Sequence, residues 1–222
     1  MAAHASHELR TPLTLARAEI EALARQDGDR GSIARALKAI DRLVELVEAL
    51  LWFAKTQTPL DDGAMDVVNL ADMVRDDVAK RQAETASIPI ACHLPDEALV
   101  RGDERLLGRV IANLLDNAFK YGQGGPVELR ARRDDARLQL TIANGGGLTT
   151  QVRARLFEPF FQGNGGTHEG GGFGLGLPFA RAVARAHGGD LAASDDQVDR
   201  TAFVLTLPLI AWTDEAPSSP GV

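Results

Sequence analysis

Apolar residues recur every three or four positions through the first quarter of the chain, which is the period of a helix with one apolar face. They follow a four-three spacing from Leu9 to Leu23 and again from Ile33 to Ala54. That spacing is typical of the a/d seam of a coiled-coil-like bundle. Residues 27–31, Asp-Gly-Asp-Arg-Gly, form a breaker-rich turn between the two runs. The pattern therefore predicts a helical hairpin over residues 1–57.

The predicted hairpin has more apolar seam than two helices can bury against each other. Two hairpins placed side by side form a four-helix bundle with a closed core, so the pattern favours a homodimer through residues 1–57. The alternative is a monomer in which the hairpin packs on the rest of the chain.

The pattern changes after a turn-rich linker at residues 58–66. Helical periods then alternate with short strand-like runs, and the clearest run places Leu138, Leu140 and Ile142 alternately with polar residues. This mixture predicts an α+β domain over residues 67–212, with a mixed sheet covered on one face by helices. A polar tail at residues 213–222 is expected to be disordered. The expected helices are residues 70–84, 104–121 and 173–187, and the expected strands are residues 88–93, 127–133, 138–143, 190–194 and 202–207.

Composition narrows the classes of function. The 222 residues carry a formal net charge of −7, and the pI is about 5.2, so no nucleic acid partner is expected, because a phosphate-binding surface normally needs a basic excess. The single cysteine, Cys92, cannot form an internal disulfide, which fits a reducing cytoplasm. No apolar run approaches the roughly 18–20 residues that span a bilayer. We therefore expect a cytoplasmic fragment that makes no membrane contact of its own.

The stretch from Ser6 to Leu13 carries the most distinctive chemistry. It reads Ser-His-Glu-Leu-Arg-Thr-Pro-Leu and places His7 beside Glu8, off the apolar seam and facing water. Thr11 is the i+4 neighbour of His7 on the same helix face. Pro12 removes an amide donor and clashes with a carbonyl one turn earlier, which is unusual in a purely structural helix. A lone histidine is more often an ordinary surface residue, but these neighbours favour a reactive one.

A second stretch places polar side chains along one face of the helix expected at residues 104–121. Asn113, Asn117 and Lys120 stand at i, i+4 and i+7, so they project together beside an apolar stripe. Amide oxygens that end in an ammonium group suit the triphosphate of a magnesium-bound nucleotide. A merely solvated helix face is the alternative, but it explains two asparagines poorly, because asparagine is a weak helix former.

A glycine-rich stretch follows, with eight glycines from Gly163 to Gly176. It ends in Gly-Phe-Gly-Leu-Gly-Leu at residues 172–177 and passes directly into an apolar helix. Glycines let the backbone approach phosphate closely, and the start of a helix directs free amides at an anion. A flexible linker is the alternative, although a linker would not run straight into such a helix. The pattern therefore predicts a lid over a nucleotide.

In their order along the chain, these stretches resemble the sequence boxes of the sensor histidine kinases of bacterial two-component systems. Residues 7–13 match the H-box at every position, residues 109–122 resemble the N-box, Phe157–Phe161 resembles the F-box and residues 172–177 resemble the G2 box. The resemblance implies a HisKA-type dimerisation and phosphoacceptor domain, followed by a GHKL ATP-binding domain with the Bergerat-type α/β sandwich. It also implies that the chain is the catalytic part of a longer, membrane-bound or soluble sensor.

The resemblance further implies the activity and the site residues. ATP with Mg²⁺ would phosphorylate His7, and the phosphoryl group would pass to an aspartate on the receiver domain of a response regulator. Glu8 would act as a base, and Thr11 would serve a reverse phosphatase reaction. Asn117 would offer its oxygen to Mg²⁺. The residues expected to bind the nucleotide are Asn113, Asn117, Lys120, Tyr121, Asn144, Gly146, Gly172, Gly174, Leu175 and Gly176.

The chain departs from the family pattern at the G1 box, where an aspartate normally recognises the adenine amino group. The sequence here is Ala143-Asn144-Gly-Gly-Gly-Leu. If Asn144 takes that position, its amide oxygen still accepts from adenine, and binding weakens by roughly 1 kcal/mol because the charge is lost. If Ala143 takes it, the site has no side-chain acceptor. The glycine spacing leaves both registers open.

Two other functions remain in view, and the departure at the G1 box motivates the first of them. One is a dimeric signalling scaffold that has lost productive use of ATP. The other is an ATP-driven conformational clamp like the gyrase and heat-shock chaperone ATPases, although a clamp gives no role to His7 and Glu8.

Overall fold

The computed structural model describes residues 65–84, 88–163, 174–194 and 200–213, together with seven single residues nearer the N-terminus. All seven are helical, and those on the predicted seam of the second helix are half-buried. The rest of the predicted hairpin, most of the linker and the tail after Thr213 lie outside the described residues. The seven single residues are Arg17, Ile20, Glu21, Ile33, Leu37, Ile40 and Val47.

The chain divides into two compact units, and the larger one comprises Pro59–Glu158 and Gly176–Val222. Its main sheet has five strands in the order β2-β4-β5-β7-β6, and a smaller sheet has the order β1-β3-β8. Strand β2 runs parallel to β4, and the other neighbours in the main sheet are antiparallel, so the sheet is mixed as expected. The strands are β1 Asp66–Asn69, β2 Ile90–His93, β3 Glu97–Gly102, β4 Val127–Asp134, β5 Arg137–Gly145, β6 Asp190–Ser194, β7 Arg200–Pro208 and β8 Ala211–Thr213.

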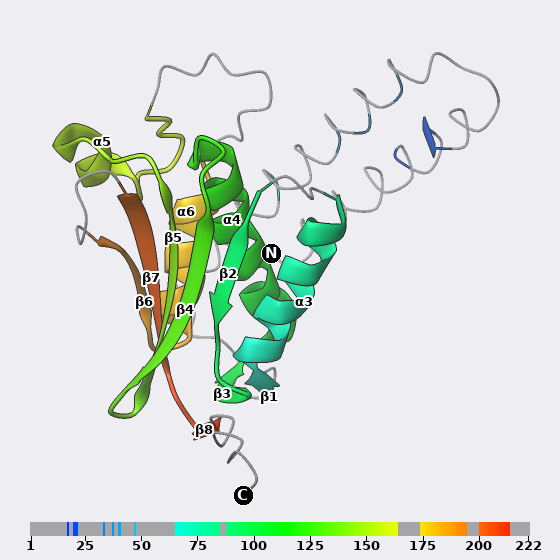
Figure 1. Cartoon of the computed structure of the whole chain (residues 1–222), viewed down its shortest axis with the longest axis vertical. Coiled ribbons are helices and arrows are strands. Elements are labelled where there is room, and N and C mark those ends of the chain that lie inside the picture. The colour runs from blue at the N-terminus through cyan, green and yellow to red at the C-terminus, as the bar shows by residue number, and fades with distance from the viewer. Residues whose placement is uncertain are drawn as a thin grey trace, which may run out of the picture. The chain divides into compact units, whose positions relative to one another are not determined.

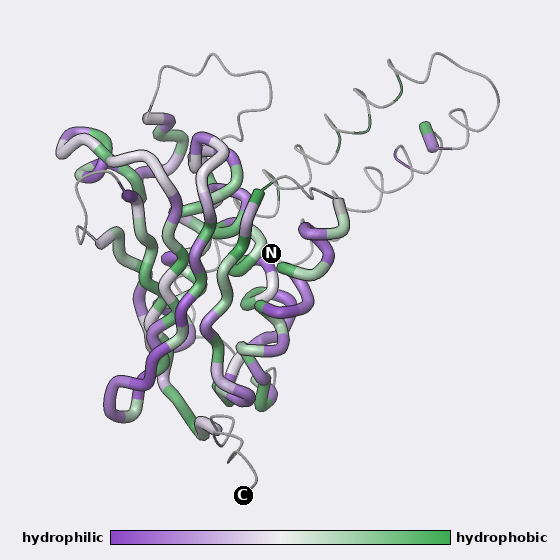
Figure 2. The backbone as a smooth tube through the Cα atoms, in the orientation of Figure 1, coloured by the Kyte–Doolittle hydropathy of each residue, from purple (hydrophilic) through white to green (hydrophobic). Residues whose placement is uncertain are grey.

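Helices cover one face of the main sheet, as Figure 1 shows for α4 and α6. The inward positions of β5, namely Leu138, Leu140 and Ile142, are at most 1% exposed. Figure 2 shows the matching alternation of hydropathy along the strands and the hydrophilic tip of the β4–β5 hairpin. The α+β class is therefore confirmed. The helices are α3 Leu70–Glu84, α4 Glu104–Tyr121, α5 Thr150–Arg155 and α6 Gly176–Ala186.

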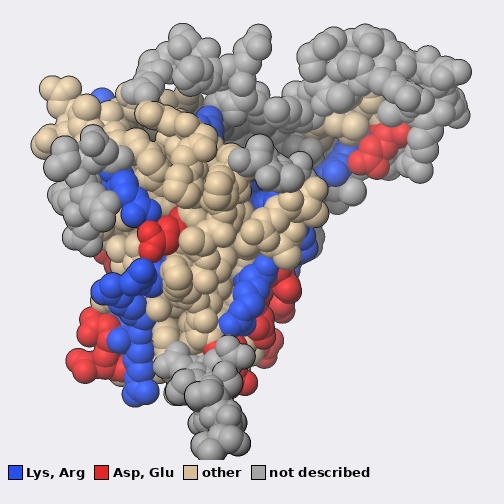
Figure 3. Space-filling view, viewed as in Figure 1, with Lys and Arg blue, Asp and Glu red and all other residues tan. Residues whose placement is uncertain are grey.

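The bounds of α3, α4 and β6 agree with the prediction, and α6 begins at Gly176 instead of residue 173. Four short elements were not predicted, namely β1, β3, β8 and α5. Strands of three to six residues have too little periodicity to be recognised alone, and β3 pairs with β8 more than a hundred positions later. Among the described residues, no helix is both long and apolar enough to cross a membrane. Acidic and basic side chains are interleaved on the face drawn in Figure 3.

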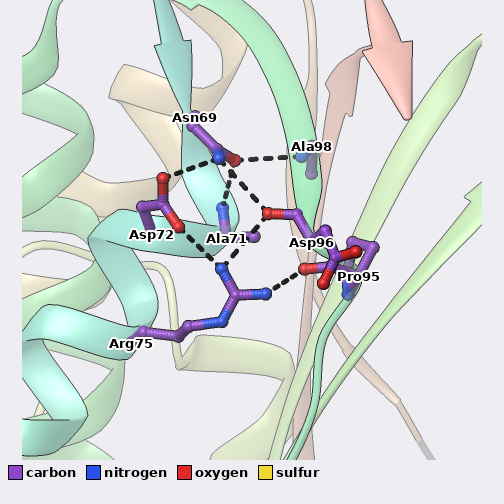
Figure 4. Close-up of polar contacts among 7 residues, drawn as sticks. All are labelled: Asn69, Ala71, Asp72, Arg75, Pro95, Asp96 and Ala98. Carbon is purple, nitrogen blue, oxygen red and sulfur yellow. Dashed lines mark hydrogen bonds and ion pairs between the residues drawn. The ribbon is translucent and has the colours of Figure 1, made fainter. Parts of the chain in front are cut away.

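A network around Asn69 joins the small sheet to α3 (Figure 4). The Oδ1 atom of Asn69 accepts from the backbone N–H of Ala71 at 3.2 Å and of Ala98 at 2.9 Å. Its Nδ2 atom donates to Asp72 at 2.8 Å, and Asp72 in turn accepts from Arg75 at 2.7 Å. One side chain therefore satisfies a free amide at the start of α3 and another at the start of β3.

His187 joins the end of α6 to the start of α4. Its Nδ1 atom lies 2.8 Å from the carbonyl oxygen of Val183, which can only accept, so Nδ1 carries the proton. Its Nε2 atom therefore accepts from the backbone N–H of Asp103 at 3.1 Å. Asp103 caps α4, because its side chain accepts from the N–H groups of Arg105 and Leu106.

An ion-pair cluster fixes the side of α6 to the edge strand β6. Arg181 donates to both carboxylate oxygens of Asp190, at 2.9 and 3.2 Å, and Arg185 donates to one of them at 3.0 Å. The hydrogen bond from Arg181, followed by that from Arg185, holds the pKa of Asp190 well below its usual value, although partial burial opposes the shift. The guanidinium of Arg181 also lies 4.5 Å from the ring centroid of Phe157.

This cluster predicts a dependence of stability on pH. Because the pKa of Asp190 is lower in the folded protein than its ordinary 3.8, the stabilisation is complete above that value and is lost as the pH falls below it. Arg181 and Asp190 are 30% and 44% exposed, so we expect Asp190→Asn to cost about 1 kcal/mol or less at neutral pH. Urea unfolding of both proteins at pH 7 and pH 3 measures this, and the difference between them should shrink at pH 3. A difference that grew toward low pH would contradict the prediction.

Candidate functional site

Helix α4 presents the predicted polar stripe beside its apolar face. Asn113 and Asn117 are half-buried, and Lys120 is exposed near the end of the helix. The Nζ atom of Lys120 lies 4.9 Å from the ring centroid of Tyr121, which is 46% exposed. The apolar face is fixed because each of its residues is at most 1% exposed, so the stripe cannot rotate without exposing the core. The buried residues are Leu107, Val110, Ile111, Leu114, Leu115 and Ala118.

Asn144 lies near the end of β5, in phase with the inward-facing Leu140 and Ile142. Side chains of a strand alternate between its two faces, so the amide points toward the helix-covered face and Ala143 points to the other. Asn144 is only 2% exposed. The strand geometry therefore puts Asn144 on the side where a nucleotide would bind between the sheet and the helices.

Two hydrogen bonds organise the backbone at this end of β5. The Nδ2 atom of Asn144 donates to the carbonyl oxygen of Gly145 at 2.7 Å. The Oγ1 atom of Thr201 donates to the carbonyl oxygen of Gly146 at 2.5 Å. Gly146 has a φ of 93°, a conformation that favours glycine. Both polar side chains are buried and are hydrogen-bonded to the turn.

Sequence reasoning did not assign Thr201 to the site. The feature that could have identified Thr201 is its place in β7, because it is the one polar residue in a buried inward row. That row is Thr201, Phe203, Leu205 and Leu207. A buried hydroxyl at the end of an apolar row usually satisfies a specific partner. That partner is the carbonyl of Gly146, next to the predicted adenine site.

The end of α4 contacts the end of β5 through glycines. A Cβ atom at Gly122 would lie 3.4 Å from the Cβ of Asn144, and one at Gly145 would lie 3.2 Å from the carbonyl oxygen of Gly122. A Cβ at Gly146 would lie 3.2 Å from the carbonyl oxygen of Tyr121. The two backbones therefore approach closely, and the polar stripe of α4 ends beside Asn144.

Helix α6 meets the same stripe at its first residue. The Nδ2 atom of Asn113 lies 3.4 Å from the carbonyl oxygen of Gly176, and a Cβ at Gly176 would lie 3.5 Å from the Oδ1 atom of Asn113. The beginning of α6, the polar face of α4 and the end of β5 thus converge. Free amides at the start of a helix bind phosphate readily, so this arrangement can hold the phosphates at one end and a base at the other.

The residue Gly174, just before α6, is hydrogen-bonded to the F-box. The backbone N–H of Phe160 donates to the carbonyl oxygen of Gly174 at 3.1 Å. Gly174 has a φ of 69°, and a Cβ there would lie 2.5 Å from the carbonyl oxygen of Phe161, so only glycine fits. Leu175 is buried, with 6% exposed. Gly172 and most of the predicted lid lie outside the described residues.

The predicted catalytic residues His7, Glu8 and Thr11 also lie outside the described residues. For the expected Mg²⁺, the donor chemistry near α4 is suitable. The side chain of Asn117 is half-buried and makes no hydrogen bond to another described residue. The described part of the chain has no cluster of three or more His, Cys, Asp or Glu that would hold a metal by itself. Mg²⁺ usually takes one or two protein oxygens and completes its shell with phosphates and water.

Two family models match the chain. Residues 1–59 match the model described as the His Kinase A (phospho-acceptor) domain. Residues 102–211 match the model described as histidine kinase-, DNA gyrase B- and HSP90-like ATPase. The second match contains α4, the end of β5, α6 and Thr201.

Relatives and solved structures agree with these models. The chain is 34% identical to the probable sensor histidine kinase TcrY of Mycobacterium tuberculosis, across 95% of this chain and 46% of TcrY. It is 30% identical to the signal transduction histidine-protein kinase BaeS of Escherichia coli, across 92% of this chain and 45% of BaeS. The chain therefore spans about half the length of these relatives. Full-length ShkA in complex with AMPPNP superposes with a TM-score of 0.74 and 26% identity, over 97% of this chain and 46% of ShkA.

Proposed function

The chain belongs to the sensor histidine kinases, and on that premise we propose that it phosphorylates His7 with ATP and passes the phosphoryl group to a response regulator. The nucleotide binds where α4, β5 and α6 converge. Asn144 accepts from the adenine amino group, and Gly146 brings the backbone close to the base. Asn113, Lys120, Tyr121 and the start of α6 hold the phosphates, and Gly172, Gly174 and Leu175 belong to a lid over them.

The observation that most directly supports this proposal is the convergence of three elements around one polar stripe. The stripe ends beside the buried amide of Asn144, and it begins 3.4 Å from the first carbonyl of α6. An apolar α4 packed on a sheet for stability alone would not need two half-buried asparagines beside its apolar face. AMPPNP, bound in the ShkA structure, is a triphosphate analogue of ATP.

Phosphoryl transfer needs mainly positioning and charge neutralisation. Asn117 would hold Mg²⁺ through its amide oxygen, and Lys120 would face the phosphates. When bound, Mg²⁺ neutralises charge on the phosphate oxygens. Because His7 belongs to one unit and Asn117, Lys120 and Asn144 belong to the other, the linker near Pro59 must allow the γ-phosphate to reach the imidazole.

The imidazole of His7 supplies the nucleophile. A lone pair on one ring nitrogen forms a bond to the γ-phosphorus, and the bond from that phosphorus to the bridging oxygen breaks, with its electron pair leaving on ADP. Glu8 accepts a hydrogen bond from the N–H of the other ring nitrogen and takes that proton as the phosphohistidine forms. Such general base assistance typically contributes about 10²–10⁴-fold to a rate.

The partners follow from the same proposal. The helical hairpin of residues 1–57 pairs with a second copy into a four-helix bundle, and the receiver domain of a response regulator docks there to take the phosphoryl group onto an aspartate. The fragment acts in the cytoplasm as the catalytic part of a longer sensor.

The first test replaces the proposed phosphoacceptor. With ATP labelled at the γ-phosphate, His7→Gln should lose essentially all acid-labile label because its side chain has no nucleophilic nitrogen, whereas ATP affinity should be unchanged. His4→Gln is the matched control and should retain the label. Label that persists in His7→Gln contradicts the proposal. Free phosphate without labelling of the wild type would indicate an ATPase clamp, and neither product would indicate a scaffold.

The second test concerns the magnesium ligand. Asn117→Ala removes the amide oxygen, so we expect the affinity for Mg-ADP to fall by at least about tenfold, with little change when EDTA replaces Mg²⁺. Asn117→Asp keeps an oxygen and should recover part of the loss. Arg105→Ala, at an exposed position of α4, is the control. Calorimetric titration measures all four proteins, and equal losses with and without Mg²⁺ would exclude the metal role.

A third test addresses the reverse reaction. Thr11 is one helical turn from His7, where its hydroxyl can orient a water molecule for hydrolysis of the phosphorylated regulator. Thr11→Ala should therefore lower regulator phosphatase activity by about tenfold or more while autophosphorylation persists. A phosphatase rate equal to that of the wild type would remove Thr11 from this role.

A further inference from the structure

We propose that Arg81 of α3 controls the charge at the phosphate end of the nucleotide site, because it holds the carboxylate of Asp116 and so leaves the ammonium group of Lys120 for the phosphates. The inference rests on the proposed binding of ATP along α4. Arg81 acts through Asp116 and is not itself assigned to the nucleotide, so it is a positioning residue.

Asp116 and Lys120 stand four residues apart on α4, with the acid nearer the start of the helix. At this spacing and in this order, a carboxylate and an ammonium group attract each other on a helix surface. If they paired, the positive charge proposed to meet the phosphates would be neutralised. A carboxylate beside Asn117 would also repel a nucleotide polyphosphate. Asp116 therefore opposes nucleotide binding unless another cation holds it.

Arg81 holds Asp116 from the neighbouring helix. Its Nη1 atom donates to the Oδ1 atom of Asp116 at 2.5 Å, and its Nη2 atom donates to the backbone carbonyl oxygen of Ala112 at 3.3 Å. Asp77, one turn earlier on α3, accepts from the same guanidinium at 3.4 Å. The guanidinium also lies 5.7 Å from the ring centroid of Phe119. It is therefore fixed between α3 and α4, which lie side by side in Figure 1.

The guanidinium of Arg81 keeps its charge in this position. Burial alone would lower the pKa of Arg81, but the hydrogen bond to Asp116 and the attraction of Asp116 and Asp77 raise it above its usual value. The side chain of Arg81 is 19% exposed, whereas that of Asp116 is 65% exposed. An ion pair with one partner this exposed contributes little to stability. We therefore expect the pair to matter more to nucleotide binding than to folding.

Lys120 is directed away from Asp116. At about 100° per residue, Asp116 lies to one side of Lys120 on the helix surface, and Asn117 and Tyr121 lie to the other. The Nζ atom of Lys120 lies 4.9 Å from the ring centroid of Tyr121. Within the described part of the chain, Lys120 forms no ion pair. Its charge is therefore available on the side of Asn117, the proposed magnesium ligand.

The experiment is a calorimetric titration of the whole chain with Mg-ADP at low ionic strength. Arg81→Gln releases the carboxylate of Asp116, so the affinity for Mg-ADP should fall by about three- to tenfold. Arg81→Lys keeps a cation at this position and should recover part of the loss. Lys80→Gln is the matched control, because it removes the same charge from an exposed position one residue earlier. It should bind within about twofold of the wild type.

Asp116→Asn provides the comparison that separates charge control from structural support. Without the carboxylate, the affinity for Mg-ADP should be unchanged or rise by up to about threefold. The double variant Arg81→Gln/Asp116→Asn should bind within about twofold of the wild type. If the pair only joined α3 to α4, both single substitutions would weaken binding and the double variant would not recover. Urea unfolding measures the structural effect separately, and an affinity that followed stability across these variants would overturn the inference.

The outcomes also separate this inference from the proposed function. If the wild type does not bind Mg-ADP, the proposed nucleotide site is wrong, and this inference is wrong with it. If the wild type and Arg81→Gln bind equally well, the site stands and the role of Arg81 is overturned. An equal loss in Lys80→Gln, or a loss of threefold or more in Asp116→Asn, would overturn it as well. Asp116 is exposed, so its variant tests the inference even if Arg81→Gln fails to fold.

Discussion

The burial of the apolar face of α4 against the main sheet is the constraint on which the candidate site depends. Once Val110, Ile111 and Leu114 are excluded from water, the helix has one allowed rotation, and this fixes the direction of the asparagines beside the apolar face. The length of the helix then decides where the polar stripe stops. It stops at Tyr121 and Gly122, which contact the end of β5 beside Asn144. A nucleotide site of this kind therefore arises from packing before any ligand is present.

Much of this architecture could be predicted from local patterns in the sequence. The bounds of α3 and α4 could be predicted because each helix has a regular apolar period and a polar residue before it, Asn69 and Asp103, that satisfies free amides at its start. Strand β5 could be predicted because one of its faces is buried and the other is not. The small sheet could not, because β1, β3 and β8 are short and β8 joins from the far end of the chain. Pairing across such distances has no local signature.

The candidate site, too, could be predicted from the sequence only in part. The polar stripe on α4 could be predicted from the spacing of its residues alone. The resemblance to the family's sequence boxes depended on residue identity. The choice between Ala143 and Asn144 did not follow from glycine spacing, because loops tolerate a shift of one residue. Alternation along β5 separates them, since a shift of one position moves a side chain to the other face of the sheet. The roles of Gly145 and Thr201 depend on backbone geometry and have no counterpart in a list of residues.

Helices α4 and α6 are joined at two places. His187 connects the last turn of α6 to the cap of α4, and Asn113 contacts the first residue of α6. The two contacts lie near opposite ends of α6, so neither helix can slide along the other without breaking a hydrogen bond. The binding groups that the two helices carry therefore keep a fixed spacing, so a ligand meets them already in place and little ordering of these helices opposes its binding.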